Sequence, residues 1–154
     1  MKKPEQGFGM TIHEEELRLK KAESRLHPSP SLLVDRILEW EPGVRASGSK
    51  NVSYGERWFL GHFPAMPVMP GMLLVEAIVQ MARVLARERE GEGTWMLASL
   101  SDVKFSRIVR PGDRVVLEVK MTESRDGGYV FQGTGLVNSE RALQVGRMVL
   151  VPRE

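Results

Sequence analysis

The sequence predicts an α+β fold in which a mostly antiparallel sheet wraps around one long, buried helix. Between residues 72 and 89 no residue breaks a helix, and the first half of this stretch is apolar on nearly every side. That composition is typical of a helix buried in a core. After residue 95 the pattern changes to strand-like segments joined by short turns, which indicates antiparallel strands. One buried helix covered by one sheet forms a layered domain.

The N-terminal part carries weaker signals. Residues 1–10 look like a loose tail, and residues 14–26 predict a short charged helix with three leucines as its only large apolar residues. The next segment, 27–31, holds two prolines and predicts a loop, because proline interrupts helices. We therefore divide the chain into a tail with a short charged helix, 1–26, and a single domain, 27–154.

Turn residues separate the expected elements of the domain. Pro70-Gly71 is a helix-start signal, because proline is tolerated in the first turn, and Gly91-Glu92-Gly93 ends the same helix. Asp126-Gly127-Gly128 is a strong hairpin signal. The segments that we expect to be strands are 44–52, 95–105, 114–122, 129–137 and 142–151.

Composition excludes several classes of function. The chain has 154 residues, of which 42% are hydrophobic and 27% charged, and its net charge is +2; a strongly cationic nucleic-acid binder is therefore not expected. It has no cysteine, which excludes thiolate metal sites and cysteine nucleophiles, and its histidines show no metal-ligand spacing. No segment is apolar enough to span a membrane, and no apolar signal core is found, so we expect a cytoplasmic protein.

Two polar residues, Glu76 and Gln80, interrupt the apolar helix and share one face because they are four positions apart. A buried carboxylate is costly unless it is paired or protonated, and burial favours the protonated form, which keeps a proton donor available near neutral pH. Arg83 continues the same stripe. On the helix alone, a polar seam that faces solvent or another subunit is the more ordinary interpretation.

The loop before the helix adds a base and a hydrogen-bond donor. His62 lies in a stretch that three prolines stiffen. The backbone N–H of Gly71, at the start of the helix, suits a polarised carbonyl or an oxyanion. One short region of the sequence thus offers a base, a donor for a carbonyl oxygen and an acid, Glu76, that we expect to be buried, although each residue alone has an ordinary structural explanation.

Together, these residues resemble the motif of the 3-hydroxyacyl-[acyl carrier protein] dehydratases of fatty-acid synthesis, the FabZ type of the hotdog superfamily. The matching residues are Gly61-His62-Phe63-Pro64, Pro67, Val68, Pro70-Gly71, Glu76-Ala77 and Gln80. Lys50-Asn51-Val52 and Pro111-Gly112-Asp113 match further blocks, so the resemblance covers about residues 27–151. Residues 27–31 depart from the family, which has charged and aromatic residues there. This departure puts the acyl substrate and the assembly in question more than the reaction.

The resemblance implies a hotdog fold and the conversion of a (3R)-3-hydroxyacyl thioester to the trans-2-enoyl thioester. It assigns His62 as the base that removes the C2 proton and Glu76 as the acid that protonates or orients the departing hydroxyl. The Gly71 N–H would polarise the thioester carbonyl, the Val68 carbonyl would fix the His62 ring, and Gln80 would position Glu76. No metal or diffusible cofactor is implied, because the substrate is carried on the phosphopantetheine of acyl carrier protein.

The resemblance also implies partners. We expect acyl carrier protein and a homodimer, or a trimer of such dimers, in which His62 of one chain faces Glu76 of the other; nucleic acid and membranes are not expected. Candidate walls of the acyl tunnel, with core packing as the alternative, are Phe63, Trp95, Met96 and Leu97. Candidate residues for docking the acidic carrier protein, with a solvated strand edge as the alternative, are Lys104, Arg107 and Arg110.

Several other functions stay open. A bifunctional dehydratase-isomerase would place Asp where this chain has Glu76, and its chains tend to be longer. A hydratase or thioesterase acting on coenzyme A thioesters, and a non-catalytic acyl-binding hotdog subunit, are further alternatives. The same chemistry would also serve a polyketide or another lipid pathway.

Overall fold

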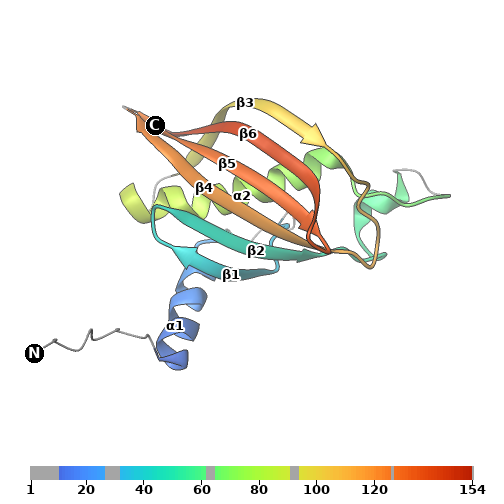
Figure 1. Ribbon diagram of the computed structural model, residues 1–154, viewed down its shortest axis with the longest axis horizontal. Helices are drawn as coiled ribbons and strands as arrows, with labels where there is room; N and C mark the ends of the chain where they lie inside the picture. Colours follow the sequence, from blue (N-terminus) through green and yellow to red (C-terminus); the bar gives the residue numbers. More distant parts are fainter. Residues whose placement is uncertain (1–10, 27–31, 62–64, 91–93, 126, 154) are drawn as a thin grey trace, which may run out of the picture.

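A six-stranded antiparallel sheet curves around one long helix in the computed structural model (Figure 1), which describes residues 11–26, 32–61, 65–90, 94–125 and 127–153. The helices are α1 (Ile12–Glu23), the 3₁₀ helix η1 (Arg57–Leu60) and α2 (Gly71–Glu90). The strands are β1 (Arg36–Glu41), β2 (Arg45–Asn51), β3 (Trp95–Phe105), β4 (Arg114–Arg125), β5 (Gly128–Val137) and β6 (Glu140–Pro152). The α+β architecture expected from the sequence is confirmed.

The strand order β1-β2-β4-β5-β6-β3 places β3 at one edge of the sheet. In the part of the chain that the structure describes, β3 pairs only with β6, and most of its residues are half-buried or exposed. A long edge strand leaves a row of backbone N–H and C=O groups without a neighbouring strand. The β3 edge is therefore ready to accept a further strand.

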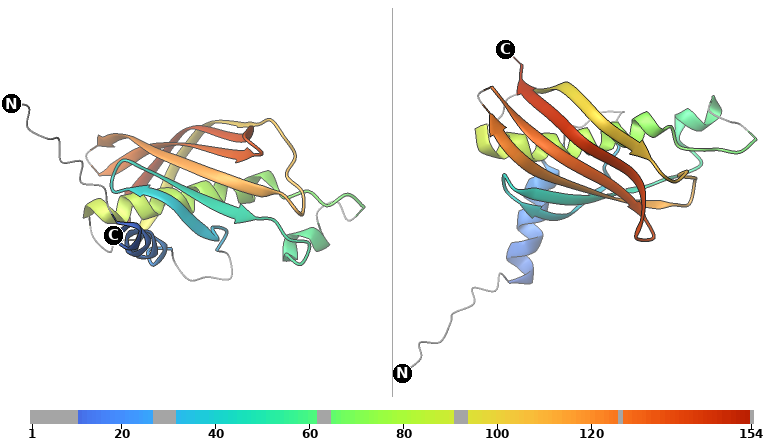
Figure 2. Two further views of the ribbon diagram at one scale, coloured as in Figure 1. Left: turned by 60° about the horizontal axis from the view of Figure 1, so that its bottom comes forward. Right: turned by 45° about the horizontal axis from the view of Figure 1, so that its top comes forward.

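Helix α2 runs through the concave side of the sheet (Figure 2), and the residues of α2 that face the sheet form the centre of the core. Ile78, Met81 and Leu85 have no exposed surface. Glycine in the sheet lets the helix approach closely: a Cβ atom at Gly48 would lie only 2.8 Å from the Met81 sulfur atom. Among the described helices, none is long and apolar enough to cross a membrane.

Helix α1 begins with a capping box at Thr11 and packs against β1. Ala22 is fully buried, and the Glu23 carboxylate accepts a 3.1 Å hydrogen bond from the Ile37 N–H. The Arg25 guanidinium lies 5.4 Å from the centre of the Trp40 ring. The short charged helix predicted from the sequence is present, and it covers part of the sheet. The division of the chain at residue 26 stays a prediction.

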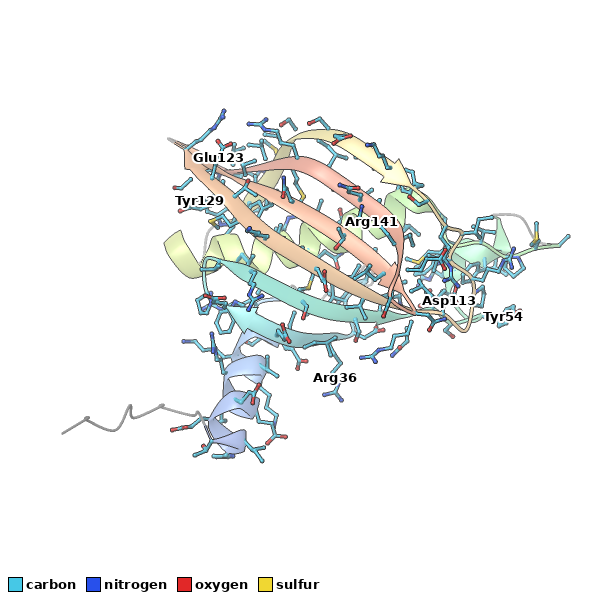
Figure 3. The ribbon with its side chains drawn as sticks, viewed as in Figure 1. Arg36, Tyr54, Asp113, Glu123, Tyr129 and Arg141 are labelled. Atoms are coloured by element: carbon cyan, nitrogen blue, oxygen red, sulfur yellow. The ribbon has the colours of Figure 1, made fainter. Side chains whose placement is uncertain are left out.

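The segment that joins β2 to α2 extends beyond the end of the sheet, where Tyr54 lies near Asp113 (Figure 3). Two backbone hydrogen bonds tie the start of this segment to the turn before β4. The Val52 N–H donates to Asp113 at 2.9 Å, and the Gly112 N–H donates to Val52 at 2.8 Å. The 3₁₀ helix η1, which lies in this segment, was not predicted from the sequence.

Candidate active site

Glu76 lies on the face of α2 that the sheet leaves uncovered. Its Oε1 atom is 3.3 Å from Gln80 Nε2 and 3.4 Å from Arg83 Nη1, and both groups donate to it. Gln80 is itself fixed, because its Oε1 accepts a 2.9 Å hydrogen bond from the Leu33 N–H. Arg83 donates through Nε to the Trp95 carbonyl at 3.1 Å. Two anchored donors therefore orient one carboxylate.

The expectation that Glu76 is buried is wrong for the single chain, because its side chain is 40% exposed. The physical reason is that Glu76 lies on the side of α2 opposite the sheet. The sheet covers the apolar side of α2, whereas Glu76 and Arg83 lie on the opposite side, where their side chains are 40% and 33% exposed. The alternative that the sequence left open, a polar seam that faces solvent or another subunit, describes this arrangement.

A cavity of about 420 Å³ adjoins Glu76, a volume within the range of ligand pockets. Four large apolar side chains contribute to it, together with charged groups from β2 and from the segment around η1. Its lining residues are Leu32, Leu33, Lys50, Gly55, Glu56, Arg57, Trp58, Leu73 and Glu76. Sequence reasoning missed the part that Lys50, Glu56 and Trp58 play here. The only signal was the Lys50-Asn51-Val52 block of the resemblance.

Gly71 begins α2 and packs against the ring of Phe105. A Cβ atom at this position would lie 2.6 Å from Phe105 Cε1, so a larger residue would collide with the ring. Because the first N–H groups of a helix have no partner within the helix, the backbone at Gly71 is suited to bind a carbonyl oxygen. Just before it, Val68 is half-buried, and the Met69 N–H donates to the Val109 carbonyl at 2.8 Å.

Two of the predicted site residues, His62 and Phe63, lie outside the described residues. Of the other candidates for the acyl tunnel, Trp95 is buried in the core, where its ring centre is 5.1 Å from that of Tyr129. Met96 is half exposed and Leu97 is half-buried. Trp95 therefore packs as the core alternative describes, whereas Met96 lies open on the β3 edge.

The three predicted docking residues do not form one cluster of free cations. The Lys104 ammonium is 3.7 Å from the Asp102 carboxylate. Arg107 donates to Glu140 at 2.8 Å and to the Val137 carbonyl at 3.2 Å, so it fastens the segment after β3 to the β5–β6 turn. The Arg110 guanidinium approaches the Met66 sulfur at 3.9 Å.

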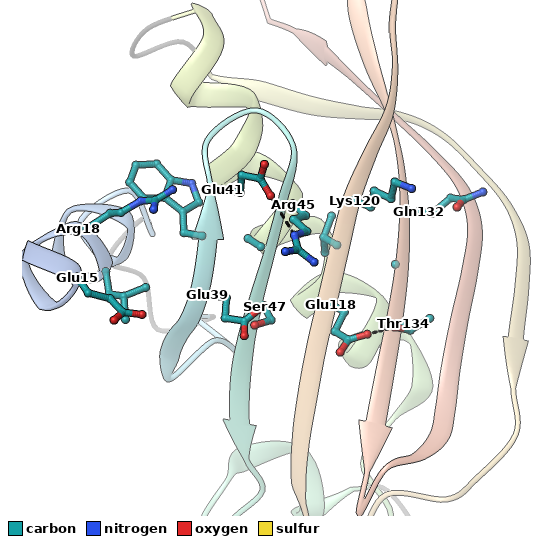
Figure 4. Close-up of a pocket in the computed structure, with 15 residues that line it drawn as sticks. Glu15, Arg18, Glu39, Glu41, Arg45, Ser47, Glu118, Lys120, Gln132 and Thr134 are labelled. Carbon is teal, nitrogen blue, oxygen red and sulfur yellow. Dashed lines mark hydrogen bonds and ion pairs between the residues drawn. The ribbon is translucent and has the colours of Figure 1, made fainter. Parts of the chain in front are cut away.

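A second hollow, of about 750 Å³, lies between α1 and the face of the sheet turned away from α2 (Figure 4). Acidic, basic and polar side chains line it, and some of them form hydrogen bonds with one another. Arg45 donates to Glu41 at 3.0 Å, and Thr134 donates to Glu118 at 3.3 Å. Within the described ranges no group of His, Asp or Glu side chains is placed to hold a metal ion.

Comparison with known proteins identifies the family. A family model described as a FabA-like domain matches residues 26–146. The chain belongs to the FabA-like domain family. Among curated proteins, this FabA-like domain is 37% identical over 148 residues to "3-hydroxyacyl-[acyl-carrier-protein] dehydratase FabZ" of Sodalis glossinidius, covering 94% of this chain and 95% of that one. It is 41% identical over 118 residues to the protein of the same name from Shewanella woodyi, covering 74% and 78%.

Solved structures confirm the hotdog fold. The dehydratase heterocomplex ApeI:P from Xenorhabdus doucetiae superposes with a TM-score of 0.72 at 14% identity, covering 86% of this chain and 91% of that one. A conserved protein from Pseudomonas aeruginosa, PA5202, superposes with a TM-score of 0.67 at 13% identity, covering 86% and 99%. At such low identity the likeness concerns the fold alone. The resemblance to FabZ-type dehydratases rests on the sequence relatives.

Proposed function

We propose that this chain is a 3-hydroxyacyl-[acyl carrier protein] dehydratase, a hydro-lyase that converts (3R)-3-hydroxyacyl thioesters to trans-2-enoyl thioesters in fatty-acid synthesis in the cytoplasm. One observation of the structure carries the proposal: an oriented carboxylate, Glu76, lies beside a largely apolar cavity on the open face of a buried helix. The similarity to proteins named FabZ, which extends over nearly the whole chain, supports the same substrate class.

The reaction sets two requirements, and the proposed site has a group for each. The C2 proton must leave, and the thioester already acidifies that carbon. His62, by the motif, takes this proton as a neutral imidazole. The C3–O bond must then break, and Glu76 gives the departing hydroxyl its proton so that water leaves. The Gly71 N–H supports the negative charge that develops on the thioester oxygen. Proton transfer between side chains and substrate is sufficient, so we propose no cofactor.

Glu76 is too exposed in one chain to act in a water-free site, and we propose that a second copy covers it. Apolar side chains that are costly to leave in water are exposed on β3, in the segment after it, and between η1 and the first turn of α2. The exposed apolar residues of this region are Leu60, Met66, Met72, Met96, Phe105 and Ile108. Pairing of two β3 edges would bury many of them and extend the sheet across the dimer. In this arrangement, His62 of one chain meets Glu76 of the other.

Turnover of carrier-linked (3R)-3-hydroxyacyl substrates tests the proposal. We expect trans-2-enoyl product on acyl carrier protein and much slower turnover of the matching coenzyme A thioesters. Formation of the cis-3-enoyl thioester would indicate the dehydratase-isomerase alternative, and release of free acid would indicate a thioesterase. Binding of the substrate without any product would indicate an acyl-binding subunit. Each of these three results would contradict the proposal.

A further inference from the structure

A cluster of charged residues centred on the buried Lys50 lies at one side of the cavity beside Glu76. Lys50, on β2, is only 6% exposed. Its ammonium group makes an ion pair with Glu56 and lies 3.9 Å from Asp35 Oδ1. Asp35 is held in turn by the Asn51 N–H at 2.5 Å. Because a buried charge without its partner is strongly unfavourable, this ion pair fixes the position of Glu56 against the end of β2.

Glu56 is the residue immediately before η1, so the same ion pair fixes the helix that carries Trp58. The Lys50 ammonium also lies 5.8 Å from the centre of the Trp58 ring, a distance at which a cation attracts the face of an aromatic ring. Trp58 also packs against Phe59, with 5.9 Å between ring centres. Phe59 is buried in the core. The indole is therefore anchored through Lys50, Glu56 and Phe59.

We infer that Trp58, held by the buried Lys50–Glu56 ion pair, limits the length of the acyl chain that the site accepts. This inference rests on the proposed function. A substrate whose C3 hydroxyl meets Glu76 extends its chain into the adjoining cavity, because the leucine side chains there remove methylene groups from water. The indole is the largest side chain of the wall. Its contacts with Lys50 and Phe59 hold it in place, so it does not move aside for a longer acyl chain.

The test compares specificity constants for carrier-linked 3-hydroxyacyl substrates with short, medium and long chains. The readout is the ratio of kcat/KM for the long substrate to kcat/KM for the short one. This ratio does not depend on the fraction of enzyme that is folded. For Trp58→Ala we expect the ratio to rise about tenfold or more, the effect that removal of a few contacts from an apolar pocket has on discrimination. Trp58→Phe should give an intermediate ratio.

Lys50→Met tests the anchor. It leaves the carboxylate of Glu56 without its partner, so η1 and Trp58 are held less firmly. The long-to-short ratio of kcat/KM should therefore rise as it does for Trp58→Ala, by a smaller factor. The double variant Lys50→Met/Glu56→Leu removes both charges, and its ratio should return toward the wild-type value. Arg45→Met is the matched control, because Arg45 lies on the same strand and pairs with Glu41 in solvent; its ratio should stay unchanged.

The outcomes separate the inference from the proposed function. A wild-type enzyme inactive on every hydroxyacyl substrate would overturn the proposed function. An active enzyme whose Trp58→Ala variant keeps the wild-type ratio would overturn the inference alone.

If that variant keeps the ratio and its dimer dissociates in sedimentation, the cavity is a subunit contact, which also overturns the inference. Should Trp58→Ala fail to fold, Trp58→Leu decides by the same ratio. A Lys50→Met variant that lowers Tm without moving the ratio would show that the ion pair is merely structural.

Discussion

The two faces of α2 differ in burial and in polarity. On the face under the sheet, Ile78, Met81 and Leu85 have no exposed surface and no polar group. On the opposite face, Glu76, Gln80 and Arg83 form a hydrogen-bonded row that is partly open to solvent. The first face contributes stability through burial of apolar surface. The second face contributes little stability, because exposed ion pairs are weak. In the proposed function, the residues for chemistry and the residues for folding lie on opposite faces of one helix. Substitutions on the open face should therefore lower activity, and substitutions on the covered face should lower stability.

The largest expected effect is on the open face. Glu76→Gln removes the proton donor and keeps the shape of the side chain, so kcat should fall by about 10²–10⁴-fold while Tm changes little. Steady-state kinetics on a carrier-linked substrate and a thermal melt check both parts. Glu41→Gln, which removes an exposed acid of the outer sheet face, is the control and should keep wild-type activity. Turnover of Glu76→Gln within a few-fold of the wild type would remove Glu76 from the reaction.

The opposite behaviour is expected on the covered face. Ile78→Ala leaves a cavity under the sheet and should lower the free energy of unfolding by about 2–5 kcal/mol. Its activity per folded molecule should stay near that of the wild type. Leu17→Ala, at an exposed position of α1, should change the free energy of unfolding by less than about 0.5 kcal/mol. Denaturant titration gives these values. A folded Ile78→Ala enzyme that has lost its activity would mean that the two faces are not separable.

A smaller effect is expected at the end of β3 and in the segment that follows it, away from both faces of α2. Reversing the charges of Lys104, Arg107 and Arg110 should raise KM for the carrier-linked substrate several-fold, because encounter with an acidic partner is steered by charge. A small thioester analogue should be unaffected. Arg107 also holds Glu140, so Lys104 and Arg110 reversed together serve as the variant that spares this contact. Equal changes in KM for both substrates would argue against docking in this region.

The sequence predicted the covered face well and the open face only partly. The 72–89 helix and the 95–105 strand agree with α2 and β3 to within a residue at each end, because hydrophobic periodicity reports directly on burial. Glu76 was expected to be buried, and it is not, because periodicity cannot show which side of a helix a second chain would cover. Gln80 was expected to position Glu76; a 3.3 Å hydrogen bond joins the two side chains, and the positioning role stays a prediction.

The anchored wall of the cavity could not be predicted from local patterns. Lys50 and Glu56 are six residues apart on either side of a turn, and a lysine is ordinarily exposed. Only the tertiary arrangement of β2 and η1 brings the two charges together and removes them from water. The η1 helix has four residues, which is too short to produce a periodic signal. His62 and Phe63 remain assignments from the motif.

The central claim is that the open face of α2 is half of a site completed by a second chain, and mixing two inactive variants tests it most directly. His62→Ala chains and Glu76→Ala chains are combined under conditions that exchange subunits, with exchange confirmed by mass labelling. If each site takes His62 from one chain and Glu76 from the other, a mixed dimer has one intact site. Because random pairing makes about half of the dimers mixed, activity should recover to about a quarter of the wild-type value. If both residues of a site come from one chain, no mixed dimer has an intact site. Activity that stays at the level of the separate variants would contradict the claim.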